Sequence, residues 1–296
     1  MAITAPIETS PSKREKREAS LRRRKIILQI FTYVMLLIMV AIVLLPIYWM
    51  VITSLKLPRE IYRVPSLWPQ VITDQNYRVL IEEKGFLTNI KNSLIVAVCV
   101  TVISLVISSL AAYSVVRFKY KFKGVIGRII LFAYLTPTSL LFIPLAIIVA
   151  RLGIGNSLYG LIIVYLTFSL PLSTWLLQGY FRNVPRELEE QAMVDGSTRL
   201  GALFKILIPL SLPGLAAVSI FTFTGAWNEL LLALIFITSE SKRTVPLGIN
   251  YLITSDVLPW GHLMAGAVLS SLPVMLLYFV AQRFMVSGAT AGSVKG

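Results

Sequence analysis

Cysteine and histidine are nearly absent from this chain of 296 residues, which has one of each, Cys99 and His262. A disulfide needs two cysteines, and a metal site built on thiol or imidazole groups needs several. The sequence also lacks a GxxxxGK[ST] phosphate-binding loop, an HExxH motif and paired carboxylates within its apolar runs. It therefore predicts no catalytic residues, no metal site and no cofactor of its own.

Charge is scarce as well. Charged residues make up 14% of the chain, whereas a soluble domain has about 25%. Hydrophobic residues reach 56% and the mean hydropathy is +0.77, which is typical of a polytopic membrane protein. The net charge of +14 could indicate a nucleic-acid partner. However, the basic residues lie in the N-terminal tail and in short loops beside apolar runs, as topology signals do, so no nucleic acid is expected.

Six runs without charge are long enough to cross a bilayer, which takes about 20 residues as a helix. We therefore predict an all-α membrane protein with six transmembrane helices. Prolines within these runs indicate kinks or, alternatively, a pathway that moves. The predicted spans are Ile26–Leu55, Ser93–Val116, Ile129–Ala150, Leu152–Phe181, Ile206–Asn228 (continuing past Glu229 to Ser239) and Leu263–Gln282.

The distribution of lysine and arginine predicts the orientation. Six spans place both termini on one side, and that side has 19 of the 28 basic residues, against nine on the other. The positive-inside rule then places both termini in the cytoplasm of a multi-pass protein of the cell membrane. Residues 1–25 are expected to form a disordered basic tail, residues 26–285 the transmembrane domain and residues 286–296 a second cytoplasmic tail. A cleavable signal peptide is the rival for the first run, which is too long for one.

Two longer segments lie on the opposite side, Lys56–Lys91 and Ser239–His262. The first is rich in proline, tyrosine and tryptophan, which suits an aromatic belt at the membrane surface. The alternative is a docking surface for an extracytoplasmic partner, and the sequence leaves both open.

The connector Asn183–Pro213 is a polar segment between two apolar runs, and its charges balance when Arg182, just before it, is counted. The topology places it in the cytoplasm. Pro185 suits a first helical position, and Gly196 a left-handed stop. Ser197 or Thr198 can cap a second helix. In that helix Leu200, Leu203, Phe204 and Leu207 follow the i, i+3, i+4, i+7 spacing of one apolar face.

Within this connector, EQAMVDG at residues 190–196 and ILIP at residues 206–209 resemble the EAA loop of bacterial ABC importer permeases. The family pattern runs E-A-A, three residues, G, nine residues, I-x-L-P. This sequence departs from it at Gln191 and Ile208, where the family has alanine and leucine. The resemblance implies a coupling loop at about residues 183–208, whose matched ATPase-coupling residues are Glu190, Ala192, Asp195, Gly196, Ile206 and Pro209.

Further stretches are similar to the carbohydrate branch, of the maltose-permease-like second-subunit type. They are LTPTSLLFIPL, TFSLPLSTWLLQGYF, GAWNELLLAL and the ending QRFMVSGATAGSVKG. The resemblance implies the type I ABC importer fold and import of a sugar by alternating access. It also implies a homologous second permease, two ATPase subunits that hold ATP and Mg, and an extracytoplasmic sugar-binding protein. The helix Pro185–Asp195 would seat in a cleft of one ATPase, and the tail Ser287–Gly296 would reach toward it.

Trp227, Asn228 and Glu229 are the candidates for the substrate pathway. An ionisable group in or near a span is by default a functional hypothesis, and an amide, an acid and an aromatic face suit sugar hydroxyls. A polar pair packed against the partner permease is an equal alternative. For the whole chain, a self-sufficient secondary transporter or channel is the rival function, and a membrane enzyme is a third. The sequence has no coupled charges within its spans, as a secondary transporter would need, and no clustered catalytic groups, as an enzyme would need.

Overall fold

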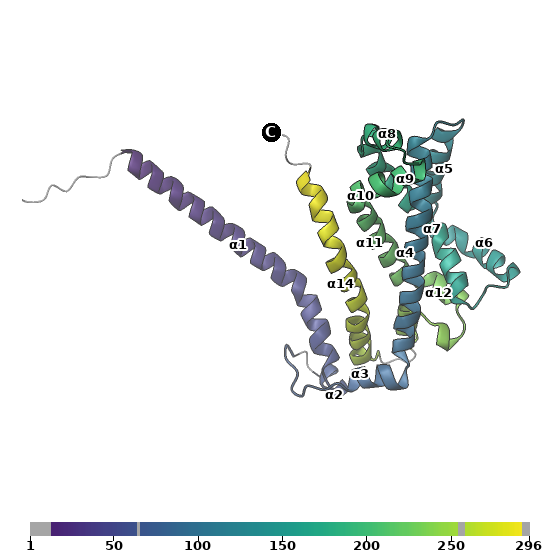
Figure 1. The fold of residues 1–296 in the computed structure, drawn as a ribbon. Coiled ribbons are helices and arrows are strands. Elements are labelled where there is room, and N and C mark those ends of the chain that lie inside the picture. Colours follow the sequence, from purple (N-terminus) through teal and green to yellow (C-terminus); the bar gives the residue numbers. More distant parts are fainter. Residues whose placement is uncertain (1–12, 64–65, 254–257, 292–296) are drawn as a thin grey trace, which may run out of the picture.

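The chain is described here from a computed structural model that covers residues 13–63, 66–253 and 258–291, with side chains from Leu21 to Met285. These residues form helices joined by short connectors, and no strand occurs among them (Figure 1). The first two long helices are α1 (Lys13–Ser54) and α4 (Phe86–Arg117). The other two are α7 (Leu158–Asn183) and α14 (Trp260–Ala291). All four are long and apolar enough to span a membrane.

Two further apolar runs are bent helix pairs. The helices α5 (Lys123–Leu135) and α6 (Thr138–Arg151) meet at 97°. The helical stretch Arg199–Leu210 meets α11 (Leu212–Asn228) at 80°. The six predicted runs thus correspond to four single helices and two bent pairs, and the described residues have up to six spans if each pair counts as one.

A proline explains the first bend, and another proline lies in the first turn of the helix that follows the second bend. Pro137 is the residue before α6, where its fixed φ of -58° and missing N–H prevent α5 from continuing. Pro213 stands in the first turn of α11, a position where a proline N–H would have no partner in any case. By contrast, Pro144, Pro171 and Pro273 lie inside continuous helices, so proline alone does not decide where a span breaks.

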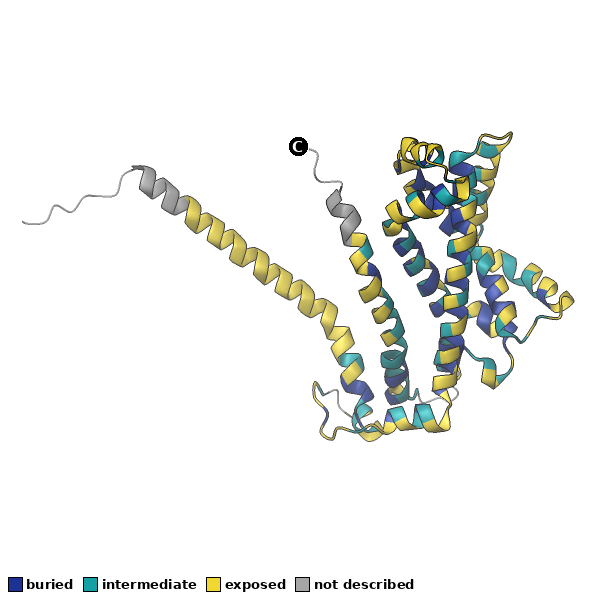
Figure 2. Cartoon of the chain, in the orientation of Figure 1, coloured by how far each residue is buried: buried dark blue, intermediate teal, exposed yellow. Residues whose placement is uncertain are grey.

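The helix α4 is the centre of the bundle and packs against α7 and α11. One buried cluster joins α4 to α7 through Val96, Val100 and Leu161. A second cluster, at the end of the bundle near α8 (Arg186–Val194), includes Tyr113 and Phe181. Figure 2 shows the buried residues concentrated on these three helices. The apolar core therefore extends along α4, which contributes residues to both clusters.

The helix α1 diverges from this bundle along most of its length (Figures 1 and 2). Its side chains from Leu21 to Tyr48 are exposed, and only its last turns pack, against α14. A long exposed apolar surface suits lipid and not water. The helix begins at Lys13, within the segment predicted to be a disordered tail, because Lys, Arg and Glu are themselves good helix formers.

At the opposite end from α8, short elements close the bundle. They are α2 (Pro58–Ile61), α3 (Gln75–Arg78), the π turn Val79–Glu83, the 3-10 turn Glu240–Lys242 and α13 (Val245–Asn250). Buried amide side chains hold them in place. The Asn76 side chain donates to the carbonyls of Ser54 and Lys56 at 2.8 and 2.9 Å. That of Asn92 donates to the carbonyls of Ser241 and Arg243, both at 2.9 Å.

Candidate functional site

A short polar helix, α8 (Arg186–Val194), follows α7 at one end of the bundle (Figure 1). The sequence predicted Pro185 as its first residue, and the structure places Pro185 one position earlier, at the N-cap. Gly196, two residues after the end of the helix, has a φ of +90°, which confirms the predicted left-handed conformation. The N–H of Gly196 donates to the Met193 carbonyl, and that of Ser197 to the Ala192 carbonyl. These two bonds satisfy carbonyls at the end of the helix and make a Schellman motif.

A second helical stretch starts directly after this stop. The Thr198 hydroxyl accepts a hydrogen bond from the Gly201 N–H at 3.0 Å, so Thr198, and not Ser197, is the cap. The stretch consists of α9 (Arg199–Ala202), a π turn (Leu203–Leu207) and α10 (Ile208–Leu210).

The π turn rotates the apolar face that the sequence predicted for this stretch. Leu203 and Leu207 are fully buried, but Leu200 and Phe204 are more than half exposed. Of the four residues predicted to share one apolar face, two are therefore buried and two are exposed. A π turn adds a residue to the turn and breaks the regular i, i+3, i+4 spacing.

An ion pair fastens α8 to the end of α4. The Arg117 Nε donates to a Glu189 carboxylate oxygen at 2.6 Å, and both side chains are over nine-tenths buried. Arg117 also donates to the Val184 carbonyl at 2.8 Å, just before α8. In return, Arg186 donates to the carbonyl of Val116 at 3.0 Å. A buried pair with such extra hydrogen bonds satisfies its charges locally, so α8 is held in one orientation on α4.

The predicted coupling residues lie on and after the outer face of α8. Glu190, Asp195 and Gly196 are exposed, and Ala192 is half-buried. Farther along the second stretch, Ile206 is half-buried and Pro209 is exposed. The most exposed apolar side chain near this face is Val194, at 87%. The segment thus presents carboxylates and one apolar side chain outward from a fixed backbone.

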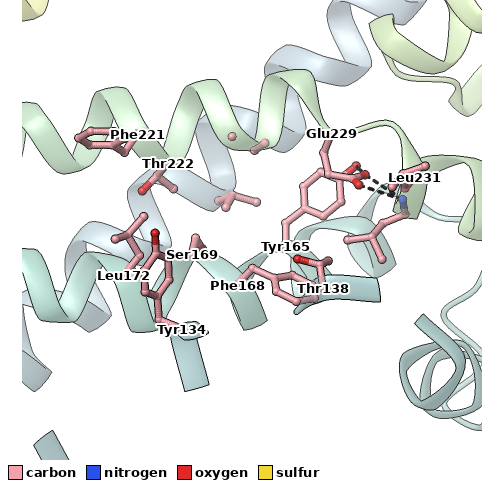
Figure 3. Close-up of a pocket in the computed structure, with 14 residues that line it drawn as sticks. Tyr134, Thr138, Tyr165, Phe168, Ser169, Leu172, Phe221, Thr222, Glu229 and Leu231 are labelled. Carbon is pink, nitrogen blue, oxygen red and sulfur yellow. Dashed lines mark hydrogen bonds between the residues drawn. The ribbon is translucent and has the colours of Figure 1, made fainter. Parts of the chain in front are cut away.

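A cavity of about 380 Å³ lies deeper in the bundle, between α4, the α5–α6 bend, α7 and α11. Its wall is mainly apolar but has several hydroxyl groups and one carboxylate (Figure 3). The polar residues that line it are Tyr134, Thr138, Tyr165, Ser169, Thr222 and Glu229.

Glu229 stands where α11 ends and α12 (Leu231–Phe236) begins. Its carboxylate accepts hydrogen bonds from the N–H groups of Leu232, at 3.0 Å, and Ala233, at 3.1 Å. The Tyr165 hydroxyl donates to the same carboxylate at 2.9 Å (Figure 3). A carboxylate at a helix start satisfies free N–H groups, so Glu229 fixes the start of α12 and the α7 contact together.

The other two pathway candidates do not line this cavity. Trp227 is 2% exposed and stacks on Phe223, with ring centroids 5.6 Å apart, inside a third core cluster. Asn228 is exposed and is not part of the cavity wall. The structure therefore brings Glu229 to the cavity and separates it from its two sequence neighbours.

Comparison with known proteins names the family. A family model described as the binding-protein-dependent transport system inner membrane component matches residues 104–289. The chain is 36% identical, over 89% of its length and 95% of the relative's, to the inner membrane ABC transporter permease protein YcjP of Escherichia coli. The chain belongs to this family of inner membrane transport components.

Other members of the family span nearly the whole chain too. The trehalose/maltose transport system permease protein MalG of Thermococcus litoralis is 34% identical over 93% of this chain and 99% of its own length. The sulfoquinovosyl glycerol transport system permease protein SmoH of Agrobacterium fabrum is 38% identical over 86% of this chain and 89% of its own length.

A solved structure shares the fold. In the crystal structure of a bacterial ABC transporter that imports the acidic polysaccharide alginate, one chain matches with a TM-score of 0.73 and 24% identity. The match covers 88% of this chain and 97% of that chain. The predicted all-helical permease fold of an ABC importer is therefore confirmed, as is the resemblance that pointed to it.

As a member of the inner membrane component family, the chain is a transport subunit and not an enzyme. Within the residues that the structure describes, no group of three or more His, Cys, Asp or Glu side chains could hold a metal ion. The matched residues, 104–289, contain both the α8 segment and Glu229. Sequence reasoning missed three residues of these sites, Arg117, Glu189 and Tyr165. The basic stretch after α4 indicated topology, and nothing in it indicated a partner for Glu189.

Proposed function

We propose that the chain is the membrane permease of an ATP-driven importer for a sugar, a di- or oligosaccharide. The observation that carries this proposal is its similarity, over most of its length, to permeases named for trehalose, maltose and diacetylchitobiose. The hydroxyl-bearing cavity supports a neutral sugar, because hydroxyl and carboxylate groups bind sugar hydroxyls and no basic residue lines it.

The chain works in a complex with a homologous second permease, two ATPase subunits and an extracytoplasmic sugar-binding protein. ATP and Mg are bound by the ATPase subunits, since this chain has no phosphate-binding loop. The permease lies in the inner membrane of a bacterium or archaeon, as a multi-pass protein with both termini in the cytoplasm. The excess of basic residues on that side supports the orientation.

The α8 segment couples the ATPase to the permease. Its exposed residues Glu190 and Asp195 face a cleft of the ATPase, and the Gly196 turn lets the following helix change direction. The ion pair between Arg117 and Glu189 passes the movement of α8 to α4. Because α4 also contributes Val100 to the cavity wall, a rigid-body rotation of α4 and α8 opens or closes the cavity. Alternating access follows from that rotation.

Of the three pathway candidates, Glu229 lines the cavity. It holds α12 and Tyr165 at the cavity wall, where a sugar hydroxyl can bind to the carboxylate. Uptake of radiolabelled sugar by Glu229→Gln and Asn228→Ala separates the two residues. We expect lower uptake for the first and unchanged uptake for the second, which lies outside the wall.

Reconstitution tests the function as a whole. The complex, purified through this chain, is placed in proteoliposomes with ATP inside and the sugar-binding protein outside. We expect ATPase subunits and a second permease to co-purify, and labelled sugar uptake to require both ATP and the binding protein. Uptake driven by an ion gradient without ATP would instead make the chain a secondary transporter, and this would refute the proposal.

A further inference from the structure

A second cavity, of about 540 Å³, lies at the α8 end of the bundle, between the ends of α4 and α7 and the start of α5. It differs from the first cavity in charge. Among the described residues that line it there is no Asp or Glu. The basic residues that line it are Arg117, Lys123, Arg128, Arg182 and Arg186.

Four of these five cations have only uncharged acceptors within the described part of the chain. Arg186 and Lys123 both donate to the Val116 carbonyl, at 3.0 and 3.2 Å. Arg128 donates to the Gly124 carbonyl at 3.2 Å, and Arg182 to the Gln178 side chain at 3.3 Å. Only Arg117 has a carboxylate partner. The cavity therefore concentrates positive charge that the fold does not neutralise.

The cations are close enough to repel one another. Arg186 and Lys123 donate to the same carbonyl oxygen, that of Val116, so their two charges lie close together. A bound anion would relieve this repulsion, and so the cavity favours one.

One buried hydrogen-bond donor in the wall also lacks a partner. Gln178 is 4% exposed and lines the cavity, and its amide nitrogen has no hydrogen-bond partner among the described residues. Buried polar groups are nearly always satisfied, so an unsatisfied donor points to an absent acceptor. Beside it, Trp175, which is 45% exposed, and Leu131 make an apolar wall. Tryptophan is enriched at the membrane–water interface.

We propose that this cavity binds a phosphate group, that of an anionic phospholipid headgroup. Arginine forks and a lysine ammonium match phosphate oxygens, and basic pockets between membrane helices bind such headgroups. The apolar wall of Trp175 and Leu131 favours a lipid over free phosphate, because it can cover the first part of an acyl chain. The lipid belongs to the cytoplasmic leaflet, a placement that rests on the proposed orientation.

The test measures lipid binding to the detergent-purified complex by native mass spectrometry. The probes are phosphatidylglycerol, phosphatidylcholine and inorganic phosphate. Arg128→Gln with Arg182→Gln removes two lining cations that take no part in the α8 ion pair. Lys119→Gln with Lys121→Gln removes the same charge from the adjoining connector, where both side chains are exposed and outside the cavity.

We expect phosphatidylglycerol to bind more tightly than phosphatidylcholine. The cavity variant should lose about 25-fold in affinity, since each basic residue near a membrane surface contributes about 5-fold. The control variant should keep the wild-type affinity. If the double variant does not assemble, each single variant is expected to lose about 5-fold.

Equal binding of the two lipids, or equal losses in the cavity and control variants, would overturn the proposal. Displacement of the lipid by millimolar inorganic phosphate would overturn the assignment to a lipid and leave a free anion as the ligand. If neither probe binds and the cavity variant loses its ATPase subunits, acidic side chains of a partner fill the cavity, which also overturns it. None of these outcomes depends on sugar uptake, so they are distinct from a failure of the proposed function.

Discussion

Two carboxylates that hold helices in place, Glu189 and Glu229, are stabilised in different ways. Glu189 is almost fully buried and pairs with one cation, Arg117, at 2.6 Å. Glu229 is half-buried and has no cation partner among the described residues; two backbone N–H groups and the Tyr165 hydroxyl donate to it instead. The first carboxylate fastens α8 to the end of α4, and the second fixes the start of α12 at a cavity wall.

The difference matches the two tasks that we propose. A buried ion pair is costly to break, so the link between α8 and α4 transmits displacement with little slack. The Glu229 Oε2 accepts from Leu232, Ala233 and Tyr165, whereas Oε1 accepts from Leu232 alone. Because a carboxylate oxygen has two lone pairs, Oε1 keeps accepting capacity. A carboxylate thus serves in both places: paired with a cation it fixes α8 on α4, and held by neutral donors it lines the cavity.

The largest expected effect comes from Gly196→Pro, at the stop after α8. Proline requires a φ near −65°, whereas Gly196 has +90° and donates its N–H to the Met193 carbonyl. We expect sugar uptake to be abolished while membrane insertion, measured by the amount of protein in the membrane fraction, persists. Gly179→Ala is the control, since Gly179 has an ordinary φ and open space at its Cβ position. Normal uptake by the proline variant at normal expression would disprove coupling through this turn.

The second largest effect is expected when the buried ion pair between Arg117 and Glu189 is broken. Arg117→Gln leaves the Glu189 carboxylate buried without its cation, which costs about 3–5 kcal/mol. We expect a clear drop in the thermal unfolding temperature of the purified complex and a loss of coupled ATP hydrolysis. Glu240→Gln removes the partner of Arg243 from a pair in which the Glu240 side chain is 77% exposed, and should cost at most about 1 kcal/mol. Equal effects of the two substitutions would show that Arg117 has no special role.

The Glu229 network should give intermediate effects. Glu229→Gln weakens bonds to a charged acceptor, worth about 1.5–3 kcal/mol, whereas Tyr165→Phe removes one hydroxyl donor, worth about 0.5–1.5 kcal/mol at a neutral acceptor and more here. We expect both to lower stability, Glu229→Gln more, and a double-mutant cycle to show coupling, since the groups lie 2.9 Å apart. Additive effects would mean that the two groups act independently.

The smallest effect is expected at the cap of the second stretch. Thr198→Ala loses the bond from the Gly201 N–H and should cost about 1 kcal/mol. Ser197→Ala, one residue earlier, removes a hydroxyl that does not cap this helix and should be close to neutral. Chemical unfolding of the complex compares them, and a larger loss for Ser197→Ala would contradict the assigned cap.

Local sequence chemistry predicted much of this segment. The stop at Gly196 depends on residues within a few positions and was correct, and the cap is Thr198, one of the two candidates that the sequence offered. Two of the four residues predicted to share one apolar face are exposed, because the π turn at Leu203–Leu207 depends on packing that spacing rules do not contain. The 80° bend between Leu210 and Leu212 was also not predicted from the sequence. Hydropathy records where a chain is apolar and not the direction in which it runs.

Long-range partners could not be predicted from one sequence. Arg117 and Glu189 are 72 positions apart, and Tyr165 and Glu229 are 64 apart. The basic stretch after α4 was interpreted as a topology signal, which is compatible with its further role in holding α8. Trp227 was grouped with Glu229 because the two are neighbours in sequence. The end of α11 separates them, so that Trp227 packs in the core while Glu229 lines the cavity.

The most direct test of the central claim is a photo-crosslinking residue at Val194, the most exposed apolar side chain of α8. The same residue at Leu67, which is 74% exposed at the other end of the molecule, is the control. In cells that express the whole complex, we expect Val194 to crosslink to an ATPase subunit and Leu67 not to do so. Crosslinking of Leu67 to the ATPase, or of Val194 to the extracytoplasmic binding protein, would contradict both the coupling role and the orientation.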